Sequence, residues 1–120
     1  MIRNLDTAEL SPVAMDGADR VSMAVMVGRD DGAPTFAMRL FSVEPGGHTP
    51  RHHHDYEHEV LIIRGDGTAH LDGHDHEIRA GDTVFVPPMA EHQFTAGSDG
   101  LRFMCMAPTS RDCGDPTPGT

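Results

Sequence analysis

Residues 51–60, RHHHDYEHEV, place four histidines and three acidic residues within ten positions. A neutral imidazole offers one lone pair to a metal ion, and its ordinary pKa of about 6.5 leaves it mostly neutral near pH 7. His52 and His54 form a His-x-His pair, which points to one face of a strand. His58 keeps the same parity, whereas the glutamates on either side of it are turned away. The stretch predicts a metal site; the alternative is a solvated polar loop.

The spacing around this stretch favours the metal site. Gly46 is followed by five residues and then by His52-x-His54; three further residues lead to His58, and six more lead to Gly65. The neighbouring acids fit this spacing less well. One of them leaves a gap of only two residues after His54, and the other fits a gap of four but is not followed by a glycine six residues later.

A second spacing pattern lies further along the chain. Gly81 is followed by five residues, Pro87-x-Met89, two residues, His92, three residues and Ala96. Together the two patterns resemble the cupin superfamily, whose motifs are written G(X)5HXH(X)3,4E(X)6G and G(X)5PXG(X)2H(X)3N. His58 stands at the usual Glu of the first motif. Met89 and Ala96 replace the Gly and Asn of the second, at positions that shape a turn and a strand end. The resemblance covers roughly residues 20–107.

The resemblance implies an all-β fold, a double-stranded β-helix (the cupin jelly-roll barrel). The His-x-His-x-x-x-His pattern with a distant histidine looks like the small single-domain cupins that use four histidine ligands, some of which hold manganese. The implied metal ligands are His52, His54, His58 and His92. The predicted substrate pocket beside the metal consists of Arg39, Phe94, Phe103 and Cys105.

Simpler roles compete at several positions. Arg39 could be a surface strand residue rather than an anion anchor, and Cys105 could be a small buried apolar side chain rather than a metal ligand or redox group. Glu57 and Glu59 are expected on a solvated face, or as acceptors for the N–H groups of ligand imidazoles. The remaining histidines are expected to be exposed or hydrogen-bonded within the protein: His48, His53, His70, His74 and His76.

The elements that must position these side chains are short strands. Segments of alternating or continuous apolar residues lie between turn signals such as PGG, GDG, DGHD and GSDG. The predicted strands cover residues 21–28, 35–44, 58–64, 68–71, 76–79, 83–86, 92–96 and 101–106. In LRFMCM, Leu101, Phe103 and Cys105 share the face without arginine, which is expected to point inward. This pattern predicts an N-terminal arm over 1–20 with a possible swapped strand, a cupin domain over 21–107, and a flexible tail over 108–120.

Composition limits the partners. The chain has 120 residues, a net charge of −10, and nine basic residues, all of which are arginine. Such a charge repels nucleic acid and anionic membranes, so neither is an expected partner. No apolar run is long enough for a transmembrane helix, and the N-terminus lacks the apolar core of a signal peptide. We therefore expect a cytoplasmic protein in which Cys105 and Cys113 are thiols.

Three functions remain open at this level. One divalent transition metal is expected; imidazole ligands suit zinc, copper, nickel or iron, and the resemblance favours manganese or iron, of which we choose manganese. The first hypothesis is a dioxygenase-like enzyme acting on a small organic substrate. The second is a metal-dependent lyase or isomerase of a sugar acid or similar oxyanion, with Arg39 pairing with a carboxylate. The third is a non-enzymatic binding module. The resemblance also implies a homodimer in which N-terminal strands pack across the partner.

Overall fold

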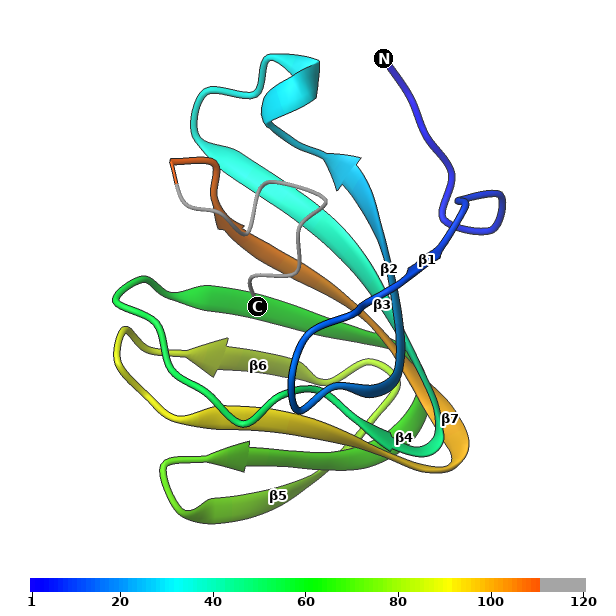
Figure 1. Cartoon of the computed structure of the whole chain (residues 1–120), viewed down its shortest axis with the longest axis vertical. Helices are drawn as coiled ribbons and strands as arrows, with labels where there is room; N and C mark the ends of the chain where they lie inside the picture. The colour runs from blue at the N-terminus through cyan, green and yellow to red at the C-terminus, as the bar shows by residue number, and fades with distance from the viewer. Residues whose placement is uncertain (111–120) are drawn as a thin grey trace.

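Strands account for nearly all the regular structure of the computed structural model, which describes residues 1–110. Figure 1 shows them folded around a common interior. The elements in chain order are β1 (Ser11–Pro12), β2 (Asp19–Val27), the 3-10 turn η1 (Arg29–Asp31), β3 (Phe36–His48), β4 (His58–Leu71), β5 (His74–Arg79), β6 (Thr83–Val86) and β7 (His92–Pro108). Cys113 and most of the predicted tail lie outside the described residues.

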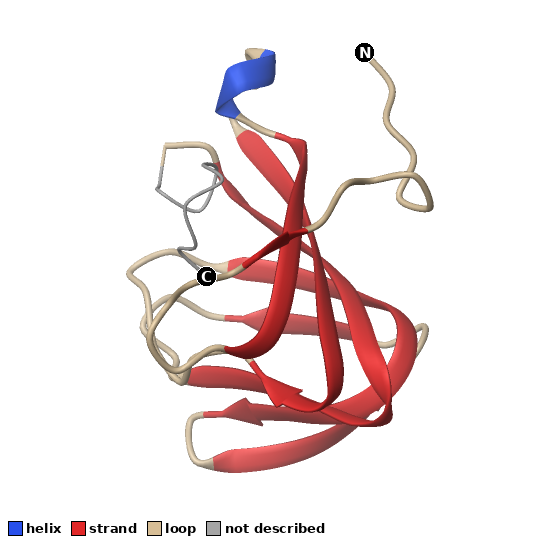
Figure 2. Ribbon diagram, turned by 45° about the vertical axis from the view of Figure 1, so that its right-hand side comes forward, coloured by secondary structure: helices blue, strands red, loops and turns tan. Residues whose placement is uncertain are grey.

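The strands pair in the antiparallel order β1-β2-β3-β7-β4-β5, and β6 pairs with the free edge of β4. The three long strands β3, β4 and β7 bend as they run, so each contributes to both halves of the barrel seen in Figure 2. This architecture confirms the all-β jelly-roll fold. Within residues 1–110, the single helical element has three residues, and no helix is long and apolar enough to cross a membrane.

The sequence predicted separate strands over 58–64 and 68–71, and over 92–96 and 101–106. In the structure each pair forms one continuous strand, so this prediction was wrong. β4 runs from 58 to 71 straight through GDG, and β7 runs from 92 to 108 straight through GSDG. Pairing between them continues on both sides, from Glu59–Met106 to Leu71–His92, with a shift in register near Gly65 and Gly67. These glycines therefore mark a bend between the two halves of the barrel rather than a reversal of the chain.

Gly65 illustrates why the bend needs glycine. Its φ of +86° lies in the left-handed region, and a Cβ placed there would collide with the carbonyl of Gly100 on β7. We expect Gly65→Ala to lower the free energy of unfolding by roughly 3 kcal/mol, because strain and a backbone clash add together. Gly73→Ala is the matched control, since its φ is +83° but no atom lies within 4 Å of the added Cβ. Equal losses in urea denaturation of the two variants would contradict this explanation.

The predicted DGHD turn is confirmed. β4 and β5 pair up to Leu71 and His74, so the connection consists of only Asp72 and Gly73. Both have positive φ, +46° and +83°, as a type I′ hairpin turn requires.

The core lies between the two halves of the barrel, and inward parity was predicted correctly for β7. Leu101, Phe103 and Cys105 are each 3% exposed. Phe103 stacks on Phe41 of β3 with ring centroids 5.1 Å apart. The inner faces of β3 and β7 thus form one apolar wall, and polar groups set into that wall are in a low-dielectric environment.

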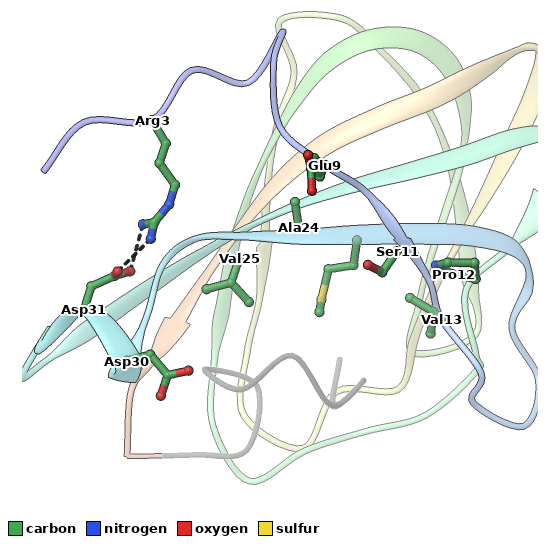
Figure 3. Close-up of a pocket in the computed structure, with 10 residues that line it drawn as sticks. Arg3, Glu9, Ser11, Pro12, Val13, Ala24, Val25, Asp30 and Asp31 are labelled. Atoms are coloured by element: carbon green, nitrogen blue, oxygen red, sulfur yellow. Dashed lines mark hydrogen bonds and ion pairs between the residues drawn. The ribbon is translucent and has the colours of Figure 1, made fainter.

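The N-terminal arm lies against β2 of its own chain, where Ser11 pairs with Met23. Arg3 forms two charge-assisted hydrogen bonds of 2.9 and 2.8 Å with Asp31 in η1. Between the arm and β2 lies a pocket of about 220 Å³, drawn in Figure 3. The side chains that line it in the described part of the chain include no histidine or cysteine. This pocket is therefore separate from the histidine cluster.

Candidate metal centre

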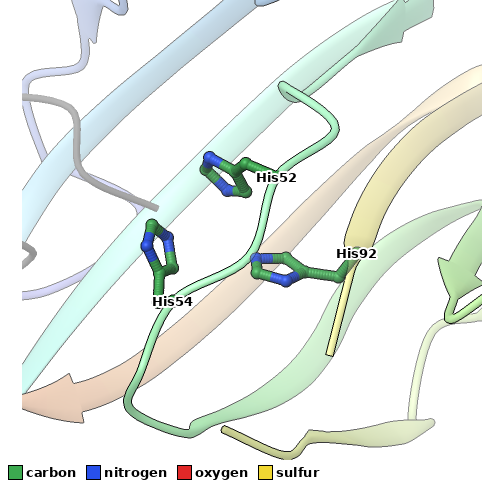
Figure 4. A group of neighbouring side chains, drawn as sticks. All are labelled: His52, His54 and His92. Carbon is green, nitrogen blue, oxygen red and sulfur yellow. The ribbon is translucent and has the colours of Figure 1, made fainter. Parts of the chain in front are cut away.

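Two separate chain segments bring the histidines together. His52 and His54 lie in the loop between β3 and β4, and His92 begins β7. Backbone hydrogen bonds join the segments in both directions, from the N–H of His52 to the carbonyl of His92 (3.2 Å) and from the N–H of His92 to the carbonyl of His52 (2.8 Å). This small bridge fixes the position of the loop on the barrel. Figure 4 shows the three imidazoles close together, His52 and His54 extending from the loop and His92 from β7.

The three rings are close enough to share one ion. Their centroids lie 4.4 Å apart for His52–His54, 4.7 Å for His52–His92 and 5.5 Å for His54–His92. One nitrogen of each lies within 4.8 Å of those of the other two. Small ring rotations bring nitrogens at this separation to the metal–nitrogen distances of about 2.1 Å found in proteins.

His58 lies next to this trio but has a second contact. Its ring centroid is 5.3 Å from those of His54 and His92. Its Nδ1 lies 3.2 Å from Sγ of Cys105, while its Nε2 is buried with no hydrogen-bond partner among the described residues. If Nδ1 carries the proton and donates to the sulfur, Nε2 presents its lone pair to the cluster. The structure thus gathers all four predicted ligands, three of them with converging nitrogens.

Buried nitrogens without partners indicate that the cluster is incomplete without an ion. Both ring nitrogens of His52 lack a hydrogen-bond partner among residues 1–110. An unsatisfied buried polar group costs about 1–3 kcal/mol, so native proteins rarely keep several side by side without a purpose. A divalent transition metal would accept these lone pairs. The residues present therefore fit a metal.

His92 is also oriented for such a role. Its Nδ1 lies 3.0 Å from the carbonyl oxygen of Ala90, so an N–H at Nδ1 donates to that carbonyl and leaves Nε2 as the acceptor nitrogen. Sequence reasoning missed Ala90, because a backbone acceptor carries no side-chain signal. Tyr56 stacks on His54 with ring centroids 4.7 Å apart and an interplanar angle of 6°.

Burial keeps the cluster neutral. Desolvation lowers the pKa of His52 to about 3, with smaller contributions from the neighbouring imidazoles and Arg39. Desolvation likewise lowers the pKa of His58 to about 2, again with His92 and Arg39 adding unfavourable positive charge. Both side chains therefore hold free lone pairs across the physiological pH range, which is the state that metal binding requires.

These pKa shifts predict acid sensitivity for metal-free protein. The unfolded chain protonates both imidazoles near pH 6.5, whereas the folded protein keeps them neutral down to pH values of about 3 and 2. The unfolded state thus binds more protons in this window. The free energy of unfolding should fall by up to about 1.4 kcal/mol per pH unit for each group as the pH drops below about 6.5.

Urea denaturation of chelator-treated protein between about pH 7 and pH 5 measures this slope. His58→Gln should make it shallower, because the titrating imidazole is gone. His53→Gln alters an exposed neighbour that makes only the smallest contribution to the shift of His52, so it should change the slope much less. An equal slope in the His58 variant and the wild type would contradict the assignment.

Arg39 is the most unusual residue of the predicted pocket. It is 0% exposed and lies near the start of β3, opposite Cys105. Its Nη2 lies 3.7 Å from Sγ of Cys105, and its guanidinium carbon lies 5.1 Å from the centroid of the Phe41 ring. Nε and Nη1 have no hydrogen-bond partner in the described part of the chain. The surface-strand alternative is therefore wrong. Arg39 is a buried cation that pairs with no carboxylate among residues 1–110, and it lies close enough to His52 and His58 to lower their pKa values.

The other predicted pocket residues form the inner wall. Phe94 and Phe103 pack with centroids 4.8 Å apart, and both line a small cavity together with Cys105. This cavity also touches His58 and His92 and measures about 10 Å³, which is room for roughly one water molecule. Sequence reasoning missed Phe41 and Thr49. The parity of β3 places Phe41 on the face of Arg39, so that signal was available.

The remaining histidines have simpler environments. His70 is buried, and its two ring nitrogens lie 2.8 Å from Oδ1 of Asp75 and 3.3 Å from Oε1 of Glu91. His74 and His76 are exposed on β5, and His53 is exposed beside the cluster. The sequence interpretation placed all of these outside the metal site, and the structure keeps them apart from the three converging imidazoles.

The chain is similar to known proteins over the region that contains the site. Residues 39–107 match the family model for the cupin domain. The chain is 37% identical over 79 residues to 1-methylthio-D-xylulose 5-phosphate methylsulfurylase of Rhodospirillum rubrum, a match covering 65% of this chain and 51% of that protein. It is 42% identical over 59 residues to the dimethylsulfoniopropionate lyase DddW of Ruegeria pomeroyi, covering 49% and 39%. The chain thus spans about half, or less, of the length of these curated relatives.

A solved structure resembles the whole barrel. The polyketide cyclase RemF from Streptomyces resistomycificus superposes with a TM-score of 0.82 at 29% identity, covering 91% of this chain and 80% of that one. The relatives thus share the fold and differ in the activities that their names describe.

Proposed function

The chain belongs to the cupin domain family, and from this premise we propose that it is a divalent-metal-dependent lyase acting on a small anionic substrate. The observation that carries the proposal is the pairing of two features in one interior. Imidazoles converge on a common point, and the buried guanidinium of Arg39 lies behind them with unpaired N–H groups. A cation site beside a fixed positive charge suits a substrate with a carboxylate or phosphate.

Each side chain has a separate task in this proposal. His52, His54 and His92 would hold the metal, with His58 as a fourth ligand. A bound divalent cation would supply a Lewis acid that polarises a substrate oxygen. Arg39 would pair with the anionic group of the substrate and orient it. Tyr56, packed between His54 and His58 at ring-centroid distances of 4.7 and 5.2 Å, is our candidate for proton exchange with the substrate.

The curated relatives support a lyase with a sulfur-containing substrate. The names of both proteins describe compounds that carry a methylated sulfur and an anionic group, a carboxylate in one and a phosphate in the other. For this reason we place the lyase, the second hypothesis from the sequence, ahead of the dioxygenase-like enzyme. We propose small organosulfur anions as its substrate class.

The dioxygenase-like enzyme is the second candidate, and one observation favours it. The cavity beside His58 and His92 is lined mainly by apolar side chains and, at about 10 Å³, suits a very small apolar molecule. Dioxygen meets that description.

Oxygen dependence separates the two candidates. Protein loaded with Mn²⁺ would be supplied with dimethylsulfoniopropionate and related short organosulfur acids, with and without oxygen, and volatile sulfur products would be measured. The lyase predicts equal turnover in both atmospheres, and Tyr56→Phe should reduce it at unchanged metal content. Turnover only in air would support the dioxygenase-like enzyme. No turnover by metal-loaded protein in either atmosphere would contradict both and favour a binding module.

Other expectations from the sequence remain predictions. Manganese is our proposed metal, and metal analysis of protein purified without an affinity tag tests it. A cytoplasmic location also stays a prediction, which fractionation of the source cells would check. The homodimer likewise stays a prediction, which sedimentation velocity of the full chain would check.

A further inference from the structure

The loop that carries His52 and His54 is joined to the start of β7 by two pairs of hydrogen bonds. In the first pair, the N–H of Thr49 donates to the carbonyl of Phe94 (2.9 Å), and the N–H of Phe94 donates to the hydroxyl of Thr49 (2.9 Å). The second pair is the backbone bridge between His52 and His92. These contacts determine where the loop lies on the barrel, so they also determine where His52 lies.

Pro50 and Arg51 lie between these two pairs. Pro50 has no N–H and can donate no hydrogen bond there. On the other side, Gln93 lies between the two partners on β7, His92 and Phe94. Consecutive side chains of a strand point to opposite faces, so the amide of Gln93 is on the face away from the imidazole of His92.

The amide group of Gln93 forms hydrogen bonds with both ends of this stretch. Its Oε1 accepts from Nε and Nη2 of Arg51, at 3.3 and 3.2 Å. Its Nε2 donates to the carbonyl of Thr49 at 2.9 Å. Among side chains of this length, glutamine alone offers a carbonyl acceptor together with an N–H donor, and Gln93 is the only glutamine of the chain. One planar group thus holds two residues of the segment that leads into His52.

His52 depends on this support more than His92 and His58 do. The ring of His92 is oriented by Nδ1, which donates to the carbonyl of Ala90 at 3.0 Å, and the ring of His58 contacts Sγ of Cys105. Both ring nitrogens of His52 are without a hydrogen-bond partner among residues 1–110. Histidines that bind metals usually have such an orienting partner. The position of the His52 ring therefore follows from the position of its own backbone.

We propose that Gln93 is a positioning residue of the metal centre, which holds the backbone before His52 so that the imidazoles of His52 and His92 converge on one ion. Gln93 acts through Arg51 and Thr49 and is not itself a ligand. The inference deepens the proposed function, because it rests on the metal centre described above. It depends neither on the reaction nor on the substrate class.

The physical basis is the fraction of molecules in which the loop is in place. The converging nitrogens lie within 4.8 Å of one another, so the folded loop needs only small ring rotations to bind an ion. When only part of the population has this arrangement, the apparent affinity for the ion falls by that fraction. Hydrogen bonds that keep the loop on β7 therefore raise metal affinity without touching the metal.

Gln93→Met tests the proposal, because methionine keeps the length of the side chain and removes both its acceptor and its donor. We expect the variant to bind Mn²⁺ about 10- to 100-fold more weakly than wild type in competition with a chromophoric chelator. The melting temperature of the metal-free variant should fall by only about 5 °C. Thr95→Val is the matched control and should keep wild-type affinity. Thr95 shares the face of Gln93 on β7, but its side chain takes no part in these hydrogen bonds.

A double-mutant cycle tests whether the contact with Arg51 carries the effect. Arg51→Met should weaken Mn²⁺ binding in the wild-type background and weaken it less when Gln93→Met is already present, because the partner of the guanidinium is then gone. The loss of one positive charge is the same in both backgrounds, so it cancels in the comparison. A general loss of stability would instead give additive effects.

Amide hydrogen exchange of the metal-free protein measures the restraint directly. The N–H of His52 donates to the carbonyl of His92 in the bridge, and in Gln93→Met it should exchange at least about 10-fold faster than in wild type. The N–H of Ile62 donates to the carbonyl of Asp82 in the core and should keep its rate. A role limited to folding would change both rates together.

The possible failures are distinguishable. Wild-type Mn²⁺ affinity in Gln93→Met, or an equal effect of Arg51→Met in both backgrounds, would overturn the positioning role and leave the metal centre intact. A wild type that binds no transition metal would overturn the metal centre and this inference with it. Metal binding that depends on Gln93 in a protein without lyase activity would support the positioning role and contradict only the proposed reaction.

Discussion

His52→Ala is expected to abolish tight binding of a divalent transition metal, weakening the affinity by well over 100-fold. Changes to groups that merely support metal ligands cost about 10- to 100-fold, and loss of a ligand should exceed that range. The same substitution removes no hydrogen bond of the imidazole, because neither ring nitrogen has such a partner among residues 1–110. Stability of the metal-free protein should therefore not suffer, which separates a ligand from a structural histidine.

The control for this experiment is the adjacent residue. His53 is exposed and is not among the three histidines whose nitrogens converge, so His53→Ala should keep wild-type metal content. Elemental analysis of tag-free protein and competition against a chromophoric chelator measure occupancy and affinity. Wild-type protein without a bound transition metal, or a His52 variant with unchanged affinity, would contradict the metal centre.

A second pair of variants determines the role of His58. If Nε2 is a fourth ligand, His58→Ala should lower metal affinity far more than Cys105→Ala, which removes only the sulfur 3.2 Å from Nδ1. Cys105→Ala should still weaken binding, by about 10-fold, because that contact orients the ring. Unchanged affinity in the His58 variant would leave a three-histidine site in which His58 only contacts Cys105.

Arg39→Met is expected to stabilise the metal-free protein while removing its response to anions. The guanidinium is 0% exposed, and two of its nitrogens lack acceptors in the described part of the chain. Replacing a buried charge by an apolar side chain of similar length can raise the free energy of unfolding by about 1–4 kcal/mol. Such a cost is typical of a residue kept for function rather than for stability.

Arg39→Met should also remove the rise in melting temperature that anions cause. Millimolar short carboxylates should raise the melting temperature of wild-type protein by binding to the folded state, and this shift should disappear in Arg39→Met. Arg79→Met alters an exposed arginine and should change the free energy of unfolding by no more than about 0.5 kcal/mol. It should also keep the anion-dependent shift in melting temperature. A loss of stability in Arg39→Met would instead make Arg39 a structural residue.

The local pattern in the sequence was enough for most of the strand content and for the pair His52 and His54, whereas His92 was identified through the resemblance to the cupin superfamily. Alternation along LRFMCM placed Phe103 and Cys105 inward, because side chains of a strand must alternate between its faces. The pair His52-x-His54 likewise pointed to a shared site. Local chemistry also identified the Asp72–Gly73 turn, since both residues tolerate positive φ.

Properties that depend on contacts between distant segments were decided only by the tertiary structure. GDG and GSDG look like turns, but β4 and β7 continue through them because the two strands pair with each other along their length. The backbone hydrogen bonds between His52 and His92 set the spacing of the cluster. No residue type in the sequence indicates such a bridge, because it involves backbone groups alone.

The same holds for the electrostatics of the site. A sequence shows an arginine and a cysteine 66 positions apart, and only folding places Arg39 and Cys105 opposite each other in a buried interior. The sequence by itself determined which side chains could bind a metal, because that property belongs to the imidazole. The tertiary structure decided how closely their nitrogens approach one another and which described charged groups are buried without a partner. Burial from solvent and the distances between these side chains are set only when the strands pair.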